Sequence, residues 1–338
     1  MAKKSVRLTR SGKTTAAPPA QRATATRRKR LRPPRLLTYV DAVARHGSIR
    51  KAAEALSVAS SALNRQILDL ELDLGSELFE RLPRGVRLTA VGEVFLAYAR
   101  QAISELKAVE SQVEQLRGLV RGQVGIAAVE SVTGELLPSA ITQFQAKHPN
   151  VRFHVRIGAP DDLVSALIAD QVDLILTHHP PPKKSVTIVS TVEQALCALM
   201  VADHPLINRD ELLLRDCLAY PLALGDATLA GRALIEQALA QAYFDLDPRL
   251  ISNSVETMKA FVRMNRGVCF QFRRRSGKAL IPPGDMMAVP LADPALQQPK
   301  LILAARRGRV LPIAAARFVE LLKGVMSAED HNETTGRS

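Results

Sequence analysis

The sequence contains no tryptophan, few other aromatic residues and only three cysteines among its 338 residues. Aromatic residues make up 4% of the chain and apolar residues 47%, so the cores must be built mainly from Leu, Val, Ile and Ala. Cys197, Cys217 and Cys269 lie far apart and form no CxxC pair, which indicates reduced, buried thiols rather than disulfides. No apolar run approaches the roughly 18 residues needed to span a bilayer. We therefore expect a soluble, cytoplasmic protein without a membrane partner.

The patterns that accompany catalysis are also missing. The seven histidines show no metal-ligand spacing such as HExxH, and no nucleophile is paired with a base in a known motif. The sequence accordingly predicts no metal, no cofactor and no enzyme activity. An enzyme that uses His178, His179, Asp173 or Cys269 is the alternative, and no spacing supports it.

Positive charge is concentrated at the amino terminus. The chain carries a net charge of +13, and residues 1–35 hold twelve Lys or Arg and no acid, which leaves 34 basic and 33 acidic residues elsewhere. Residues 1–34 are rich in Thr, Ala and Pro and lack apolar periodicity, so they are predicted to form a disordered basic arm. Such an arm suits contact with nucleic-acid phosphates, although a purely solubilising extension has the same composition.

Residues 35–89 show the pattern of a helix-turn-helix. "RLLTYVDAVARHGS" and "IRKAAEAL" form short amphipathic helices, with Ser48 as cap of the second, and "SVA" makes a tight corner. In the next helix, which begins at Ser60, four residues at helical spacing form an apolar stripe: Leu63, Ile67, Leu70 and Leu74. Polar side chains occupy its front end and opposite face, as in a helix that reads DNA bases.

A wing is predicted after this helix. Pro83, Arg84 and Gly85 supply a turn, and Val86, Arg87 and Leu88 alternate as in an edge strand. The predicted DNA contacts of the helices and the wing are Ser48, Arg50, Ser60, Ser61, Asn64, Arg65, Arg84 and Arg87.

A long helix is predicted over residues 90–118, which contain no proline. Its apolar residues step by four and three, a heptad seam typical of pairing between helices: Phe95, Ala99, Ala102, Leu106, Val109, Val113 and Leu116. The seam predicts a dimerisation helix that presents two reading heads to a two-fold DNA site. Packing of the helix against its own chain is the alternative.

Strands and helices alternate over residues 119–326, which predicts an α/β domain of two lobes, followed by a flexible tail at 327–338. "GQVGIAAV", "VRFHVRI" and the fully apolar "VDLILT" are strands of a first lobe, as a buried parallel sheet requires. "YPLAL", "RLISN" and "GVCFQF" are strands of a second lobe, and "KLILAA" with "IAAARFVELLKGVM" is predicted to return to the first.

The segment "SIRKAAEALSVASSALNRQILDLELDLGSELFERLPRGVRLTAVG" resembles the amino-terminal signature of LysR-type transcriptional regulators in motif order and spacing. "LPSAITQFQAKHPNV" and "LIADQVDLIL" are similar to phrases of that family's effector domain. The resemblance implies a winged helix-turn-helix, a linker helix and a two-lobed, periplasmic-binding-protein-like α/β domain. The implied function is sequence-specific regulation of transcription by a homodimer or homotetramer that binds double-stranded DNA and engages RNA polymerase.

By the same resemblance, a small effector binds between the lobes. The predicted lining is Ser131, Thr133, Thr177, His178, Asn253 and Ser254. Hydroxyl groups and helix amino termini suit an anionic effector, although Thr133 and Ser254 are equally suited to capping helices. The family's usual Gly-rich turn is replaced by "NRGVCFQFRRR", whose Arg273, Arg274 and Arg275 are suited either to an acidic effector or to plain exposure to solvent.

The chain departs from the family's pattern at Ala59, Ser60 and Asn64, so the family's interrupted T…A palindrome is not carried over. Ala159 and Pro160 also replace a loop that often holds a hydroxyl. A nucleoid-type DNA binder driven by the basic arm is the competing class.

Overall fold

The computed structural model describes residues 31–116, 120–178, 180–242, 246–274, 279–281, 284–296 and 299–328. Residues 1–30 of the predicted basic arm, residues 329–338 of the predicted tail, His179 and Arg275 lie outside these residues.

The amino-terminal domain contains the predicted helix-turn-helix. Helices α1 (Arg35–His46), α2 (Ile49–Leu56) and α3 (Ser60–Leu74) follow one another as expected, and Ser48 caps α2 by accepting a hydrogen bond from the Lys51 backbone N–H. Between α2 and α3, Ser57 adopts a left-handed conformation with φ 54°, which turns the chain sharply. The predicted cap and corner are therefore confirmed.

The apolar stripe of α3 is confirmed over most of its length. Leu63, Ile67 and Leu70 are buried in the domain core, which they form with residues of α1, α2 and α4. Leu74 is 44% exposed, so its assignment to the stripe was wrong. The α3 helix ends directly after it, at Gly75 with φ 63°, and the chain turns away before Leu74 can reach the core.

The wing is a two-stranded antiparallel hairpin of β1 (Phe79–Leu82) and β2 (Gly85–Leu88). Gly85 has φ 137°, and a Cβ atom at this position would lie 2.3 Å from the carbonyl oxygen of Gly47. The Val86 N–H donates to that same oxygen at 2.9 Å. Close approach of the wing to the α1–α2 turn thus requires glycine at position 85.

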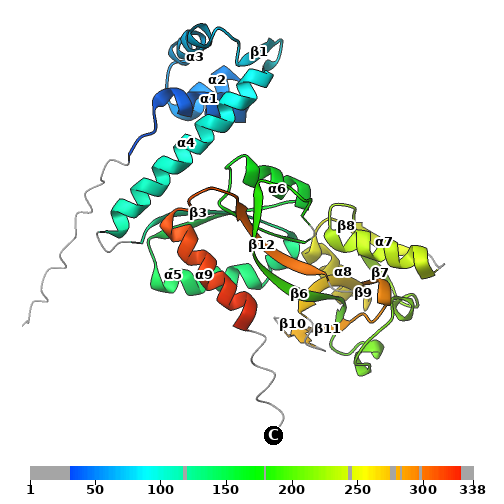
Figure 1. Cartoon of the computed structure of the whole chain (residues 1–338). Coiled ribbons are helices and arrows are strands. Elements are labelled where there is room, and N and C mark those ends of the chain that lie inside the picture. The colour runs from blue at the N-terminus through cyan, green and yellow to red at the C-terminus, as the bar shows by residue number, and fades with distance from the viewer. Residues whose placement is uncertain are drawn as a thin grey trace, which may run out of the picture. The chain divides into compact units, whose positions relative to one another are not determined.

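The predicted long helix is α4 (Ala90–Gln115) (Figure 1). In the second half of the proposed seam, Val109, Val113 and Leu116 are exposed, as pairing with another helix would require. In the first half of the helix the predicted seam is displaced by one residue. Ala99 is fully buried there, and Phe95 packs against the domain core. The exposed residues there are Val91, Val94 and Tyr98 instead.

The first lobe of the carboxy-terminal domain is an α/β unit. Its sheet contains β3 (Gly122–Ala128), β4 (Val151–Ile157) and β5 (Leu174–His178) as parallel neighbours, with antiparallel β12 (Lys300–Arg306) beside β5. Helices α5 (Leu136–Lys147), α6 (Pro160–Ile168) and α9 (Ile313–Ala328) accompany the strands. The predicted return of the last strand and helix to this lobe is confirmed.

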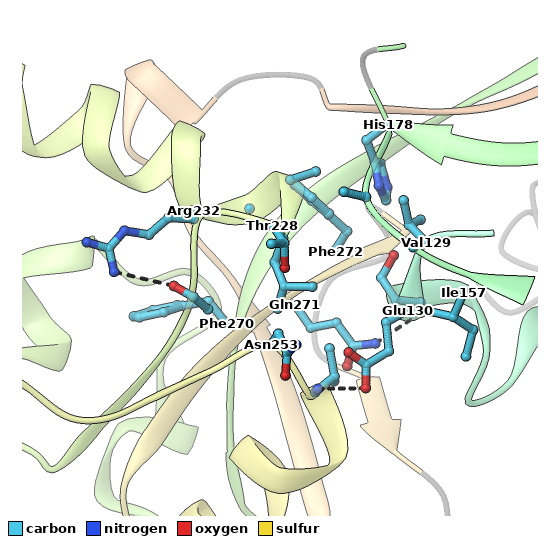
Figure 2. A pocket seen from close by; sticks show the side chains of 18 of the residues that line it. Val129, Glu130, Ile157, His178, Thr228, Arg232, Asn253, Phe270, Gln271 and Phe272 are labelled. Carbon is cyan, nitrogen blue, oxygen red and sulfur yellow. Dashed lines mark hydrogen bonds between the residues drawn. The ribbon is translucent and has the colours of Figure 1, made fainter. Parts of the chain in front are cut away.

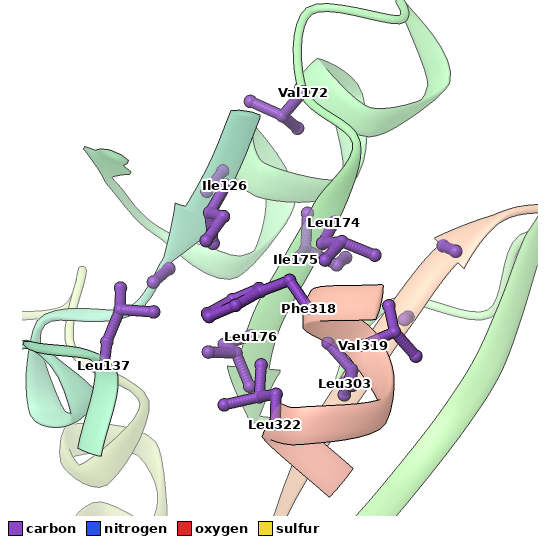
Figure 3. Packing of buried hydrophobic residues seen from close by; sticks show 14 of the residues in the cluster. Ile126, Leu137, Val172, Leu174, Ile175, Leu176, Leu303, Phe318, Val319 and Leu322 are labelled. Carbon is purple, nitrogen blue, oxygen red and sulfur yellow. The ribbon is translucent and has the colours of Figure 1, made fainter. Parts of the chain in front are cut away.

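The core of the first lobe is built from aliphatic residues around a group of phenylalanine rings. Phe318 of α9 is fully buried and packs with Leu174, Ile175 and Leu176 of β5 (Figure 3). Its ring meets those of Phe144 and Phe153 edge to face, with centroids 5.4 and 4.8 Å apart. The buried β5 explains why its sequence is apolar at successive positions.

The second lobe has its own parallel pair, β7 (Leu222–Gly225) and β8 (Pro248–Ser252), and β7 also pairs with β9 (Val268–Arg274). Helices α7 (Ala230–Ala242) and α8 (Val255–Asn265) follow β7 and β8, and β10 (Ala279–Ile281) pairs with β11 (Met286–Pro290).

The two lobes share β6 (Val186–Val201), a strand of 16 residues that the sequence reading missed. Its first half pairs with β12, up to Glu193 opposite Lys300, and its second half pairs with β9 and β11, from Gln194 onward. One continuous strand thus belongs to both sheets. Across the described ranges, no helix has the length and apolarity to span a bilayer.

Candidate functional site

The predicted DNA-reading residues of α3 lie on its solvent side. Ser60, Ser61 and Arg65 are exposed, and Arg65 is only loosely paired with Asp69, at 3.9 Å. The amino-terminal cap position is Ala59, which offers no side-chain acceptor to the first backbone N–H groups of the helix. This end of α3 therefore presents hydroxyl groups, a guanidinium group and a helix amino terminus to solvent.

Asn64 differs from its neighbours because it is half-buried and bonded to the wing. Its Oδ1 accepts a hydrogen bond from Arg81 Nη2 at 3.1 Å. Arg81 lies on β1 and was not among the predicted contact residues. The only available signal was its place in "FERLPRG", three residues before Arg84.

The other basic residues of this domain are exposed. Arg50 pairs with Glu54 at 3.3 Å, and Arg87 pairs with Glu80 across the hairpin at 2.6 Å. Arg84 lies exposed in the turn of the wing. Ion pairs of exposed residues contribute little free energy, so they can be exchanged for phosphate contacts at small cost.

A cavity of about 290 Å³ lies between the two lobes of the carboxy-terminal domain. Of the predicted effector-binding residues, Ser131, His178 and Asn253 line it (Figure 2). Most of its wall is apolar, with Leu196, Ile235, Val255, Phe270 and Phe272 among the residues that the sequence reading missed. The His178 and Phe272 rings are in contact, with centroids 4.2 Å apart.

Thr133, Thr177 and Ser254 were also predicted to line the cavity, and they do not. Thr133 donates its hydroxyl hydrogen to the Glu130 carbonyl oxygen at 2.7 Å, and Thr177 is fully buried. Ser254 caps α8 by accepting from the Thr257 N–H. Local hydrogen bonds within the chain therefore use the hydroxyl groups of Thr133 and Ser254.

Glu130 of the first lobe reaches across to the second. Its Oε1 accepts hydrogen bonds from the Val255 N–H at 2.9 Å and from the Ser254 hydroxyl at 3.2 Å (Figure 2). The prediction that α8 offers a free N–H group to an effector is therefore wrong, because a carboxylate of the protein already accepts from it. No sequence motif predicted this role of Glu130, since its hydrogen-bond partners lie more than 120 residues away in the chain.

Two further polar contacts join the lobes. Gln271 of β9 is buried and donates from Nε2 to the Ser131 carbonyl oxygen at 3.1 Å. Arg273 donates to Glu135 at 3.0 Å, so its guanidinium group pairs with a carboxylate of the protein. The side chain of Arg274 lies outside the described residues.

Arg232 of α7 lines the cavity together with Thr228 and Gly231. Its guanidinium group bonds to Glu236 at 2.7 Å and to the Gly225 carbonyl oxygen at 3.3 Å. Asp162, in the first turn of α6, is an exposed acid at the rim. Arg232 was not predicted because "AGRALIEQALAQA" shows only an ordinary amphipathic helix.

Of the groups considered for catalysis, Asp173 and Cys269 are tied into the interior of the fold. Burial raises the pKa of the Cys197, Cys217 and Cys269 thiols to about 12, so they are protonated at neutral pH. Asp173 accepts from the Gly125 N–H at 2.7 Å and pairs with Arg309 at 2.6 Å. Within the described part of the chain, no three His, Cys, Asp or Glu side chains are grouped to hold a metal ion.

Comparison with protein families decides what this architecture is. A model described as the LysR substrate binding domain matches residues 117–327. A second, described as a bacterial regulatory helix-turn-helix protein of the lysR family, matches residues 34–93. The chain belongs to the LysR family. It is accordingly a DNA-binding transcriptional regulator of that family, in which a helix-turn-helix precedes an effector-binding domain of mixed α/β fold.

Curated relatives of this LysR-family chain match most of its length. The transcriptional regulator CysB of Burkholderia cenocepacia is 29% identical over 266 residues, which are 76% of this chain and 85% of that protein. A RuBisCO operon transcriptional regulator of Allochromatium vinosum is 28% identical over 302 residues, or 85% of this chain and 94% of that protein.

Solved structures of LysR-family regulators share the fold. Full-length OxyR of Pseudomonas aeruginosa superposes with a TM-score of 0.61 at 22% identity, over 86% of this chain and 96% of that one. Full-length CbnR in complex with its target DNA gives a TM-score of 0.56 at 22% identity, over 86% and 99% of the two chains.

Proposed function

We propose that this regulator reads base pairs with Ser60, Ser61, Asn64 and Arg65 of α3, while Ser48, Arg50, Arg84 and Arg87 hold the DNA backbone. The observation that carries the proposal is the exposed, polar amino-terminal end of α3 beside an arginine-bearing wing. Arg pairs with guanine and Asn with adenine in the major groove, and helix amino termini bind phosphate. CbnR, which shares the fold, was solved in complex with its target DNA, and this supports DNA binding by the present chain.

Substitution of the two base-reading side chains tests the proposal. Asn64→Ala and Arg65→Ala should each lose about 1–3 kcal/mol of discrimination at particular base pairs. Gln66→Ala is a matched control, because Gln66 is exposed on α3 but turned about 200° from Asn64 around the helix axis. If both variants bind promoter and scrambled duplexes in the wild-type ratio, α3 is not the reading helix.

We further propose that two copies pair through α4. Six apolar residues are exposed at spacings of three and four, at both ends of the helix: Val91, Val94, Tyr98, Val109, Val113 and Leu116. At about 100° per residue, they fall on one stripe. A homodimer, or a homotetramer built from dimers, would bury this stripe and present two reading heads to DNA.

Analytical ultracentrifugation can measure this pairing. Val94→Glu should weaken self-association because it buries an unpaired carboxylate in the apolar stripe. Lys107→Glu, an exposed position on the opposite side of α4, also changes charge and should leave the oligomeric state unchanged. Equal sedimentation of the Val94→Glu variant and the wild type would contradict pairing through this stripe.

The cavity between the lobes is proposed to hold a small-molecule effector that controls transcription. Its apolar wall and few polar groups are typical of small-ligand sites. Binding there would change the lobe geometry, and through it the spacing of the reading heads and the contact with RNA polymerase. The protein would act in the cytoplasm, where its chromosomal target lies.

A further inference from the structure

The Glu130 carboxylate lies at the amino terminus of α8, where an anionic effector would otherwise bind. At the amino terminus of α8, beside the cavity, the Val255 N–H and the Ser254 hydroxyl converge, and both donate to Glu130 Oε1, at 2.9 and 3.2 Å. A negatively charged ligand at this end would have to displace Glu130 or lie beside it. Either arrangement is unfavourable because like charges repel in a partly buried site.

The remaining charges of the cavity wall do not compensate for Glu130. Asp162 adds a second carboxylate at the rim, and Arg232 is paired with Glu236 at 2.7 Å. Among the residues that the structure describes, neither Glu130 nor Asp162 forms an ion pair. Among the described residues of the wall, two acids thus face one base that is already paired, which favours a cationic ligand.

Gln271 adds a hydrogen-bond acceptor at the same junction between the two lobes. Its Nε2 donates to the Ser131 carbonyl oxygen at 3.1 Å, which fixes the orientation of the amide, because the reversed amide would place two oxygens against each other. Its Oε1 is buried and has no hydrogen-bond partner within the described ranges. A buried acceptor without a donor is unfavourable, so a ligand that brings an N–H group would relieve this cost.

Aromatic side chains form part of the cavity wall. Phe270, Phe272 and His178 line the cavity, and the Phe272 and His178 rings are in contact (Figure 2). Aromatic rings attract cations through their electron-rich faces, and they also pack against apolar ligand bodies. Carboxylates beside aromatic rings are the combination that recognises organic ammonium groups.

We infer that the effector is an organic cation: a small apolar or aromatic molecule whose ammonium group is held by Glu130. This inference rests on the proposed effector function of the cavity and names its ligand class. Glu130 is then the residue that determines specificity, since it excludes anions and attracts amines.

Three probes of one size and different charge test the inference on the full-length protein. Calorimetric titration at low salt compares benzylammonium, benzoate and benzyl alcohol. Benzylammonium should bind up to about fivefold more tightly than benzyl alcohol, the usual effect of one partly exposed ion pair, and benzoate should bind most weakly. Tighter binding of benzoate than of benzylammonium, or no binding of any probe, would overturn the inference.

Variants distinguish the proposed site from general attraction of cations. Glu130→Gln keeps an oxygen that can accept from the Val255 N–H, so the domain should fold, and it should bind benzylammonium no more tightly than benzyl alcohol. Phe272→Leu should weaken benzylammonium more than benzyl alcohol. Asp161→Asn removes an exposed acid of α6 that does not line the cavity, and it should bind all three probes like the wild type.

An unchanged preference in Glu130→Gln would show that the cation binds elsewhere and would refute the role of Glu130. Failure of the proposed regulator function has a separate signature, because the wild type would then not discriminate promoter from scrambled duplex whatever probe it binds.

Discussion

Asn64 of α3 and Arg81 of the wing are joined by a hydrogen bond of 3.1 Å between Oδ1 and Nη2. The bond turns the carbonyl oxygen of the amide toward the wing, so its NH2 group is the donor that the proposed reading mode would use. If Asn64 reads a base as proposed, its orientation depends on a residue of the neighbouring hairpin.

Arg81→Ala should therefore weaken discrimination at the base pair that Asn64 contacts. The expected loss is comparable to that of Asn64→Ala, about 1–3 kcal/mol. Because the two residues act as a unit, the double variant should lose less than the sum of the single losses. Fluorescence anisotropy with duplexes altered at single base pairs measures the coupling, and fully additive losses would show that the bond has no part in recognition.

Removal of residues 1–34 should weaken non-specific DNA binding and flatten its salt dependence. The segment carries eleven Lys or Arg, and each phosphate contact that is lost reduces the slope of log K against log salt by about 0.9. Titration of a scrambled duplex from low to physiological salt gives that slope. The ratio of promoter to scrambled binding should persist in the truncated protein, whereas its loss would favour a nucleoid-type binder driven by the arm.

Phe318→Ala should destabilise the first lobe by about 3–5 kcal/mol, since it leaves a cavity among the rings and leucines that surround Phe318. Urea unfolding followed by circular dichroism measures the loss. Met264→Ala, at a position 84% exposed on α8, is the control and should change stability by less than about 0.5 kcal/mol. A comparable loss in both variants would contradict the assigned core.

His204 should make the second lobe less stable in mild acid. Burial, aided by the positive charge of Arg266, lowers the pKa of His204 below 6.5, and its Nδ1 accepts a hydrogen bond from the Leu206 N–H at 3.2 Å. As pH falls below 6.5, the unfolded chain takes up a proton before the folded one, so stability decreases by at most about 1.4 kcal/mol per pH unit, until pH reaches the lowered folded pKa.

The variant His204→Asn isolates this effect, because asparagine can still cap the turn but does not titrate. Its unfolding free energy should depend less on pH than that of the wild type in the window just below 6.5. Parallel pH profiles of the two proteins would show that His204 does not couple folding to protonation.

Local patterns predicted the helices and most strands well. The spacing of Leu63, Ile67 and Leu70 predicted α3, and the run of apolar residues in β5 predicted a buried strand. Both patterns depend only on residues that are close together in the sequence. The strand β6 was missed, since its two halves pair with different sheets and its sequence follows no single period.

The candidate cavity was predicted only in outline. The ends of strands indicated Ser131, His178 and Asn253, but Glu130, Phe272 and Gln271 acquire their roles through partners distant in sequence. Heptad spacing likewise did not identify the exposed apolar residues in the first half of α4, because Ala99 packs in the chain's own core.

The continuity of β6 restricts how the effector domain can respond to any ligand. Since a single backbone runs through both sheets, the lobes cannot slide apart without breaking the ladders on either side of Glu193 and Gln194. Twisting or bending about that pair of residues is the motion that the fold permits. A signal from the cavity would then travel as a rotation, and a proline placed at position 194, where the N–H bonds to the Pro299 carbonyl oxygen, would interrupt it.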